Sequence, residues 1–425
     1  GARPMKLVVT IFEQSADKAI EAIRGLRLDH DMVELRVDPF GAIDFHAVRA
    51  ATAKPIIVTN RGGAPLDFEA AYGAGIDFVD VELGHDPGPR PDRVVLSHHD
   101  YDGMPDVDQL LRDMQDCAHK KLAVTPRNFA DNARLLGAIA RGVTVIGMGE
   151  RGLYSRIAAP FLGSELQFVA LDDAHVAAPG QLTFSDALTI YGGDREHLRA
   201  DKLFAVVGDP AGHSRSPLIH NPIFRERGVA AAYTIASFAT FEEIAEPFAR
   251  RDRFAPVGMS VTAPFKEEAF EFAKEVELNA GEARAVNTLA WIRGRIVADN
   301  TDVDGFEALL WSAAAMPPLS ERWHGRRTPH VAIVGAGGTA RAARVALARR
   351  GIPFTIYNRT PREGALPLEE LKNFDGDLVI DTLPSGANVT LPNVTTIRAA
   401  YQGAANDLLA AQAIRQSAIF LEACR

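Results

Sequence analysis

The chain is poor in cysteine and has no long apolar run. Its 425 residues include only Cys117 and Cys424, which lie far apart and outside any CxxC or Cys/His cluster. The sequence therefore predicts neither a disulfide framework nor a structural metal site, and it favours a reducing compartment. No stretch approaches the roughly 18 apolar residues that a membrane span requires, and the N-terminus lacks the apolar core of a signal peptide. We expect a cytoplasmic protein without membrane contact.

An excess of positive charge is also missing. The 46 Lys and Arg residues are outnumbered by 55 Asp and Glu residues, and the net charge is -9. Because the basic residues are scattered rather than gathered into a stripe, we expect no nucleic-acid partner. A small anionic substrate remains compatible, since a few local arginines can bind one. The length suits two domains of about 200 residues each, and the pattern leaves the oligomeric state open.

The first half of the chain alternates short apolar strands with helical stretches. Helical patterns cover residues 16–24, 107–117 and 129–140, whereas residues 84–92 are too rich in Gly and Pro for a helix. Eight strands with helical crossovers predict an α/β fold, a (β/α)8 TIM barrel over residues 5–196, with a doubly wound sheet as the alternative. The predicted strands are 6–12, 32–38, 55–60, 78–83, 93–99, 121–126, 144–149 and 166–171.

Charged side chains alternate with apolar ones along several of these strands. In residues 33–38 the apolar side chains share one face, which in a barrel meets the helices, so Glu34 and Arg36 point inward. The same alternation turns further polar groups inward: Asp80, Glu82, Ser97, His99 and Lys121. Buried charges are costly without partners, so this group is either a binding site or a structural ion-pair network.

A lysine and a histidine inside one barrel can carry out a specific reaction. A lysine in a low-dielectric pocket beside arginines gives up its proton more readily, and its free amine can attack a carbonyl to form a Schiff base. A neighbouring histidine can then remove the proton α to the iminium and return it to a leaving hydroxyl. The pattern therefore indicates dehydration of a β-hydroxy ketone.

Five segments resemble, in type and order, those of type I 3-dehydroquinate dehydratases: VELRVD (33–38), SHHDY (97–101), KLAVTP (121–126), SRIA (155–158) and PGQ (179–181). The resemblance implies that Lys121 is the Schiff-base lysine and His99 the general acid/base, with no cofactor. It implies substrate-binding roles for Glu34, Arg36, Arg61, Arg156 and Gln181. The family's acid before Gly62 and Gly63, which polarises the histidine, is absent here, and Glu82 is our substitute on geometry alone.

The second half contains a dinucleotide-binding pattern. Residues 331–334 form an apolar strand that runs into Gly335, Ala336, Gly337, Gly338, Thr339 and Ala340 and then into a helix at 341–350, with another strand at 353–357. This order is typical of a Rossmann domain, whose glycines let a pyrophosphate approach the helix N-terminus. Instead of the acid of an NAD site, Asn358, Arg359, Thr360 and Arg362 follow the second strand, which favours NADP. We predict an α/β substrate domain over 200–305 and a Rossmann domain over 306–425.

Four segments of the second half resemble shikimate dehydrogenases: GDPAGHSRSP (208–217), SVTAPFKE (260–267), AVNT (285–288) and DNTD (299–302). The resemblance implies that Lys266 and Asp302 form the proton-transfer pair, and it implies shikimate-binding roles for Ser214, Ser216, Thr262, Asn287, Tyr401 and Gln412. Roughly 20 residues expected between residues 402 and 406 are missing, a large loss for a packed domain. We therefore expect a less complete nicotinamide wall.

The two resemblances describe consecutive steps, since dehydration gives 3-dehydroshikimate and reduction of that ketone gives shikimate. The sequence thus predicts a bifunctional enzyme with these small molecules as its partners. Three alternatives stay open: a dehydratase with an impaired dehydrogenase half, a non-catalytic quinate- or shikimate-responsive sensor, and an NAD-dependent quinate oxidation that Arg359 disfavours.

Overall fold

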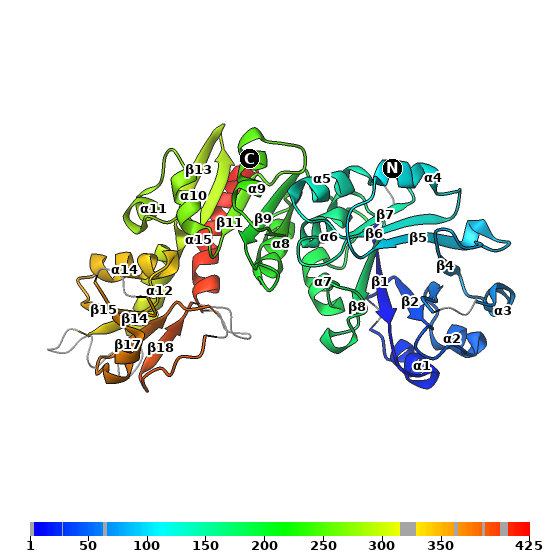
Figure 1. The fold of residues 1–425 in the computed structure, drawn as a ribbon, viewed down its shortest axis with the longest axis horizontal. Helices are drawn as coiled ribbons and strands as arrows, with labels where there is room; N and C mark the ends of the chain where they lie inside the picture. The colour runs from blue at the N-terminus through cyan, green and yellow to red at the C-terminus, as the bar shows by residue number, and fades with distance from the viewer. Residues whose placement is uncertain are drawn as a thin grey trace. The chain divides into compact units, whose positions relative to one another are not determined.

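A computed structural model describes residues 4–27, 29–62, 66–314, 329–360, 364–384, 387–399 and 407–425 (Figure 1). The chain divides into two compact units. One contains the residues up to Leu203 together with Pro217–Ala239 and Glu246–Ala255, and the other contains Phe204–Ser216, Thr240–Ala245 and Pro256–Arg425. Within the described ranges, no helix is both long and apolar enough to cross a bilayer.

The first half forms an eight-stranded parallel sheet in which the strands from β1 to β7 pair in sequence order and β8 pairs with β1. This order confirms the predicted barrel, and a doubly wound sheet is wrong. Each strand lies within two residues of its predicted bounds. The strands are β1 (Lys6–Ile11), β2 (Met32–Arg36), β3 (Ile56–Thr59), β4 (Phe78–Glu82), β5 (Val94–Asp100), β6 (His119–Val124), β7 (Val143–Gly147) and β8 (Leu166–Ala170).

The seam between β7 and β8 is held by hydroxyl groups. The backbone N–H of Leu166 donates to Thr144 Oγ1 at 3.0 Å, and that of Val145 donates to Ser164 Oγ at 3.2 Å. In the described residues this seam carries no strand ladder. Side-chain hydroxyls therefore satisfy edge N–H groups that a ladder would otherwise pair.

Short helices connect the barrel strands. Most begin at a Ser, Thr, Asp or Asn whose side chain accepts a hydrogen bond from the first turn, as Ser15 does for α1 and Asn128 for α5. No α-helix lies between β4 and β5, where only a 3-10 turn (Pro91–Arg93) forms, as the Gly- and Pro-rich stretch predicts. The helices are α1 (Ala16–Arg24), α2 (Phe45–Ala51), α3 (Phe68–Gly73), α4 (Val107–Asp113), α5 (Phe129–Gly137), α6 (Leu153–Ala158) and α7 (Phe184–Tyr191). The helices predicted at 107–117 and 129–140 end earlier.

An apolar layer fills one level of the barrel interior. It contains residues from most strands, among them Val8, Met32, Ile57, Val95 and Phe168. Because side chains alternate along a strand, the residues two positions further on also point inward, nearer the carboxyl ends of the strands. These residues include Thr10, Glu34, Thr59 and Ser97. The polar site thus rests on an apolar floor.

The described residues of the second half form two five-stranded sheets. The first has the order β10-β9-β11-β12-β13, with β9 and β11 parallel and β11, β12 and β13 antiparallel. Its strands are β9 (Lys202–Gly208), β10 (Ala231–Ser237), β11 (Gly258–Val261), β12 (Thr288–Ile292) and β13 (Arg295–Asp299). Its helices are α8 (Ser216–Glu226), α9 (Glu242–Arg250), α10 (Lys266–Phe272), α11 (Leu278–Ala283) and α12 (Thr301–Ala314). The proposed boundary after residue 305 falls inside α12.

The second sheet is wholly parallel with the order β16-β15-β14-β17-β18, which is the arrangement of a Rossmann domain. Its strands are β14 (Val331–Val334), β15 (Phe354–Asn358), β16 (Ala365–Pro367), β17 (Leu378–Asp381) and β18 (Thr395–Arg398). Helix α14 (Gly338–Arg349) follows β14 directly and begins three residues before its predicted start, and α15 (Asp407–Ala423) ends the chain.

Candidate active sites

A cavity opens in the barrel at the carboxyl ends of its strands, the position that holds the active site in barrel enzymes. Most of the polar residues expected inside the barrel line it, together with an apolar wall that includes Met148 and Phe168. Its predicted site residues are Glu34, Arg36, Arg61, His99, Lys121, Arg156 and Gln181. The structure thus brings together all seven residues that the resemblance assigns to the first reaction.

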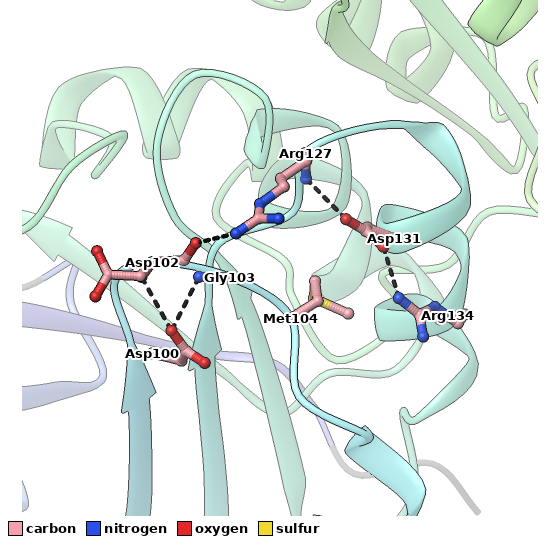
Figure 2. Close-up of a pocket in the computed structure, with 7 residues that line it drawn as sticks. All are labelled: Asp100, Asp102, Gly103, Met104, Arg127, Asp131 and Arg134. Carbon is pink, nitrogen blue, oxygen red and sulfur yellow. Dashed lines mark hydrogen bonds and ion pairs between the residues drawn. The ribbon is translucent and has the colours of Figure 1, made fainter.

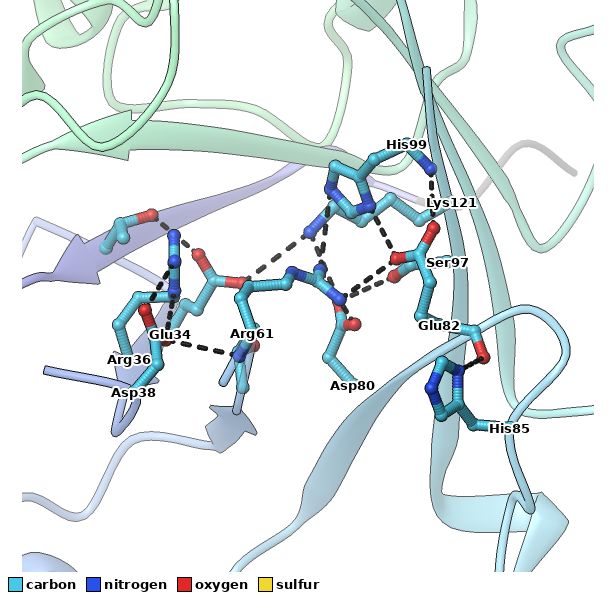
Figure 3. A network of polar contacts seen from close by, with 12 residues as sticks. Glu34, Arg36, Asp38, Arg61, Asp80, Glu82, His85, Ser97, His99 and Lys121 are labelled. Atoms are coloured by element: carbon cyan, nitrogen blue, oxygen red, sulfur yellow. Dashed lines mark hydrogen bonds and ion pairs between the residues drawn. The ribbon is translucent and has the colours of Figure 1, made fainter. Parts of the chain in front are cut away.

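Lys121 lies on β6 and is 5% exposed (Figure 3). Its Nζ donates a hydrogen bond to Asp80 Oδ2 at 3.2 Å and lies 3.6 Å from Glu34 Oε2 and 4.1 Å from the centre of the Phe168 ring. We expected arginines beside this lysine, but its nearest charged partners are carboxylates. The nearby guanidinium of Arg61 is held by Asp80 Oδ1 at 2.8 Å, so one carboxylate lies between the two cations.

The carboxylates around Lys121 are ionised in spite of their burial. Burial alone would raise the pKa of Asp80, but the charges of Lys121 and Arg61 outweigh it and hold that pKa well below its usual range. Burial would likewise raise the pKa of Glu34, but the charge of Lys121 acts against it, and the pKa is lowered. Two hydroxyl donors also bind Glu34, since Thr10 Oγ1 lies 3.0 Å from Oε1 and Thr59 Oγ1 lies 2.9 Å from Oε2.

His99, at the end of β5, is fixed by two groups with opposite requirements. Its Nδ1 lies 2.8 Å from Glu82 Oε2, and its Nε2 lies 3.4 Å from the guanidinium of Arg61 (Figure 3). Since an ionised carboxylate only accepts and a guanidinium only donates, we assign the proton to Nδ1, and Nε2 is unprotonated with its lone pair facing Arg61. Burial lowers the pKa of His99, and the charges of Lys121 and Arg61 lower it further, while the hydrogen bond that the ring donates to Glu82 raises it.

Glu82 occupies the position that our geometric reasoning gave it. One of its oxygens accepts from the His99 ring, and the other accepts from the His99 backbone N–H at 2.7 Å. Burial would raise the pKa of Glu82, but its hydrogen bond with His99 and the charge of Arg61 keep that pKa below the usual value. A carboxylate on β4 therefore contacts the histidine although no acid stands directly before Gly62 and Gly63.

Two arginines of the cavity differ in their partners. Arg36 forms two hydrogen bonds of 2.8 Å with Asp38 and is thereby neutralised (Figure 3). Arg156 on α6 is 2% exposed and, among the described residues, has no carboxylate within ion-pair distance. Its Nη1 donates to the carbonyl of Pro179 at 3.1 Å, its Nε has no partner, and burial lowers its pKa to about 10. A buried cation without a counter-ion favours binding of an anion.

Some residues of this site were missing from our predicted set. Asp80, which we expected to face inward but did not assign to the site, holds both Lys121 and Arg61. Thr10 and Thr59 bind Glu34, and Ser97 donates to Asp80 at 2.6 Å. The two-residue alternation that identified Glu34 also marks these positions, whereas an aromatic residue such as Phe168 in an apolar strand gives no such signal.

A second pocket, of about 410 Å³, lies among the elements of the second half. Predicted residues that line it are Ser214, Ser216, Thr262, Lys266, Asn287, Asp302, Thr339 and Gln412. Lys266 Nζ donates to Asp302 Oδ2 at 2.5 Å and to Thr339 Oγ1 at 2.8 Å. The lysine therefore bonds at once with the expected proton-transfer partner and with the first turn of α14.

A chain of hydrogen bonds extends from this pair to α15. Asn287 Nδ2 donates to Asp302 Oδ1 and to Thr301 Oγ1, each at 3.0 Å, and Thr301 Oγ1 lies 2.7 Å from Gln412 Oε1. Gln416, which we did not predict, donates to Thr288 Oγ1 at 2.8 Å and also lines the pocket. Helix α15 thus contributes two glutamines to the pocket despite the short connection before it.

The glycine-rich loop has the geometry that its residue types predict. Gly335 has a φ of 110°, and a Cβ there would lie 2.4 Å from Thr382 Oγ1. A Cβ at Gly338 would lie 2.9 Å from the Cβ of Lys266, so only glycine allows this approach. Ala336 continues the loop, and Ala340 is buried in α14. Gly337, which precedes α14, has open space where a Cβ would be.

The residues expected to select NADP lie at the end of β15. Asn358 donates to the Thr360 carbonyl at 2.8 Å, and Arg359 and Thr360 are exposed. Arg362 and Tyr401, also predicted site residues, lie outside the described residues.

A third hollow lies on the barrel and contains none of the predicted residues (Figure 2). Its polar groups are held by one ion pair and by hydrogen bonds to the backbone. Arg127 Nη2 donates to the Asp102 carbonyl at 2.7 Å, the Arg127 backbone N–H donates to Asp131, and Asp131 pairs with Arg134 at 2.6 Å. We assign no site to it.

Comparisons with known proteins match both halves of the chain. The model of the type I 3-dehydroquinase family matches residues 7–196, and that of the shikimate dehydrogenase substrate binding domain matches residues 206–289. The chloroplastic bifunctional 3-dehydroquinate dehydratase/shikimate dehydrogenase of Arabidopsis thaliana is 30% identical, over 92% of this chain and 72% of that protein. The shikimate biosynthesis protein AroDE of Chlamydia pneumoniae is 29% identical, over 71% of this chain and 63% of that protein.

A shikimate dehydrogenase from Thermus thermophilus, solved with NADP(H) and shikimate, is 26% identical with a TM-score of 0.38, over 50% of this chain and 84% of that chain. The similarity to the Arabidopsis protein extends over both halves of this chain, barrel and dehydrogenase alike. The chain belongs to the family of bifunctional 3-dehydroquinate dehydratases/shikimate dehydrogenases, enzymes of the shikimate pathway.

Proposed function

We propose that the barrel dehydrates 3-dehydroquinate to 3-dehydroshikimate through a Schiff base on Lys121, and that the second half reduces this product to shikimate with NADPH. One observation carries the first assignment. A buried lysine amine and a histidine whose Nε2 we assign as unprotonated line the same cavity, and these are the nucleophile and the base that the reaction needs.

Attack on the ketone requires Lys121 to lose a proton. Asp80 and Glu34 contact its Nζ. Their pKa values are lowered in part by the charge of Lys121, so each becomes a better base as that charge disappears. The amine then adds to the carbonyl carbon, and the carbonyl oxygen leaves as water to give the iminium.

Elimination follows at the neighbouring carbons. His99 Nε2 removes the proton α to the iminium, and Glu82 stabilises the resulting imidazolium through Nδ1. The imidazolium returns its proton to the leaving β-hydroxyl, which departs as a second water. Hydrolysis of the iminium consumes one water and releases the enone and Lys121, so the net reaction is loss of one water.

Arg156 is our candidate for binding the substrate carboxylate. Its guanidinium is buried without a carboxylate partner among the described residues, whereas Arg36 is already paired with Asp38. An incoming carboxylate would satisfy the free Nε and would compensate the charge. Gln181, whose Nε2 donates to Thr10 at 3.2 Å, is positioned to contact hydroxyls.

The Rossmann residues fit a dinucleotide phosphate. The open space beside Gly337 and the N-terminus of the 12-residue helix α14 suit a pyrophosphate, and the exposed Arg359 suits a 2′-phosphate. When bound, NADPH supplies the hydride. Lys266 and Asp302 deliver a proton to the ketone oxygen, and Asn287 keeps Asp302 oriented through its 3.0 Å hydrogen bond.

Two measurements on the full chain test these assignments. Reduction with borohydride in the presence of 3-dehydroquinate should leave a stable adduct on the peptide that contains Lys121, as peptide mass spectrometry would show. Addition of 3-dehydroquinate and NADPH should deplete both. Dehydration without NADPH oxidation would leave the barrel as the only working enzyme, and the absence of both reactions would support a sensor.

A further inference from the structure

The loop between β8 and α7 forms one side of the barrel cavity. It begins with a 3-10 turn (Asp173–His175) and contributes Ala177, Ala178 and Gln181 to the cavity lining. It also orients a residue outside itself, because the carbonyl of Pro179 accepts from Arg156 at 3.1 Å. The position of this loop therefore determines where two proposed substrate-binding groups, Gln181 and Arg156, lie.

His175 connects this loop to the loop that follows β1. Its Nδ1 lies 2.5 Å from Asp172 Oδ1 in its own loop, and its Nε2 lies 2.9 Å from Glu13 Oε1 across the barrel rim. The side chain of His175 is 28% exposed and that of Glu13 is 15% exposed, so the bridge is partly shielded from solvent. Both carboxylates approach the same ring, one at each nitrogen.

This arrangement requires a second ring proton. An ionised carboxylate only accepts hydrogen bonds, and a neutral imidazole has a single N–H, so it satisfies one of the two partners and presents a lone pair to the other. The imidazolium has two donors and satisfies both. Asp172 and Glu13 are the charged groups that act on His175, and the hydrogen bond to Asp172, followed by the charges of both carboxylates, raises the pKa of His175 against the effect of burial.

We propose that protonated His175 is a positioning residue of the dehydratase, which pins the β8–α7 loop to the β1–α1 loop and thereby fixes Gln181 and Arg156 for substrate binding. The proposal rests on the proposed function of the barrel. Lys121 and His99 lie on the strands β6 and β5 rather than on this loop. Loss of the bridge should therefore weaken substrate binding and raise KM, while kcat stays nearly unchanged.

Two matched variants with opposite expected behaviour test this idea in the full chain. His175→Gln removes the two-donor ring, so its dehydratase KM should exceed that of the wild type about fivefold below the pKa of His175, and the ratio should approach one above that pKa. The protonation of other groups, such as His99, changes KM of the variant and of the wild type alike. The ratio of the two KM values therefore reports the protonation of His175. In Glu13→Gln the amide can donate to an unprotonated Nε2, so KM should stay low as the pH rises.

A ratio of KM values that is the same at every pH, or a loss confined to kcat, would overturn the proposal. Histidine NMR of the ligand-free full chain gives a readout without turnover: the signal missing in His175→Gln should titrate above pH 6.5 in the wild type and at lower pH in Glu13→Gln. Failure of the wild type to dehydrate 3-dehydroquinate would instead contradict the proposed function. The NMR titration would then test the bridge independently of turnover, since a pKa of His175 at or below the ordinary histidine value would exclude the bridge.

Discussion

The two lysines at the centres of the two sites have the same side chain and different surroundings. Lys121 lies between two ionised carboxylates and above an aromatic ring, at the end of a run of ion pairs that includes Arg61, Asp80 and Glu82. Lys266 bonds to one carboxylate and one hydroxyl, and a chain of neutral amides and hydroxyls continues from there. The barrel site is organised by charge, and the dehydrogenase site by hydrogen bonds.

This difference matches what each lysine is proposed to do. A Schiff-base lysine changes its charge during the reaction. Flanking carboxylates become better bases as that charge disappears, so they can take the proton when the free amine forms and return it when the lysine is released. A lysine that passes a proton to a ketone oxygen needs above all a fixed direction, which short hydrogen bonds to Asp302 and Thr339 supply. The comparison predicts that the barrel responds strongly to charge removal and the dehydrogenase to loss of hydrogen-bond geometry.

The largest expected effect comes from exchanging each lysine for methionine, which keeps much of the volume and removes the amine. Lys121→Met should lower dehydratase kcat by at least about 10⁴-fold, because no covalent intermediate can form, while reduction of 3-dehydroshikimate continues. Lys266→Met should lower the reductase rate by about 10² to 10⁴-fold and spare dehydration. Separate assays with each substrate check this, and loss of both activities in either variant would mean that the two sites are not independent.

Replacement of Glu82 should have the next largest effect. In Glu82→Gln the imidazolium of His99 loses its counter-charge, so dehydratase kcat should fall about 10²-fold. The charge of Glu82 raises the pKa of His99, so its removal lowers that pKa further. Since kcat/KM rises with pH as His99 loses its proton, the rising limb should move to lower pH.

The exposed pair of Asp92 and Arg90 offers a matched control for this charge removal. Asp92→Asn takes away one carboxylate at the surface of the same unit, and we expect its pH profile to coincide with that of the wild type. A Glu82→Gln profile that also coincides with the wild type would show that the 2.8 Å contact has no influence on His99.

The barrel was largely predictable because its signals are local. Alternation of apolar and polar residues located eight strands and turned Glu34, Asp80, Glu82 and His99 inward. Alternation does not report which charge pairs with which, since this depends on how far a side chain reaches across neighbouring strands. Arg61, which follows β3, extends to Asp80 and Glu82 on β4. Arginines do line the cavity of Lys121, but the pattern did not show that carboxylates are its direct partners.

The second half was less predictable where contacts between distant segments determine the bounds of a helix. The sequence predicts a domain boundary after residue 305, but Gly305 lies inside α12, where a Cβ would come within 2.9 Å of Leu408 and 3.0 Å of Gln412. The glycine thus permits the close approach of α12 and α15, whose residues are about a hundred positions apart in sequence. The glycine-rich loop, by contrast, has a local pattern of strand, turn and helix, and its prediction is consistent with the structure.

A smaller effect is expected at the cofactor end of the dehydrogenase. Arg359→Ala should raise KM for NADPH about 10- to 100-fold, which corresponds to the loss of a charged hydrogen bond, and should leave KM for NADH nearly unchanged. Arg350→Ala, at the far end of α14 and in contact with Trp311, is the matched control. Equal changes for both cofactors would contradict a role of Arg359 in recognising the phosphate. At Arg359, charge rather than geometry is expected to dominate.

The smallest effect separates charge from geometry most directly. Thr339→Val is nearly isosteric and removes the acceptor that receives a 2.8 Å hydrogen bond from Lys266, so reductase kcat should fall about tenfold. Thr339→Ser keeps the hydroxyl and should remain within about twofold of the wild type, and neither variant should alter dehydration. If serine and valine reduce kcat equally, the methyl group rather than the hydroxyl positions Lys266. Packing around Lys266, rather than its hydrogen bond, would then determine the geometry of the second site. The two sites would still differ, but as a site organised by ion pairs and a site organised by the shape of its packing.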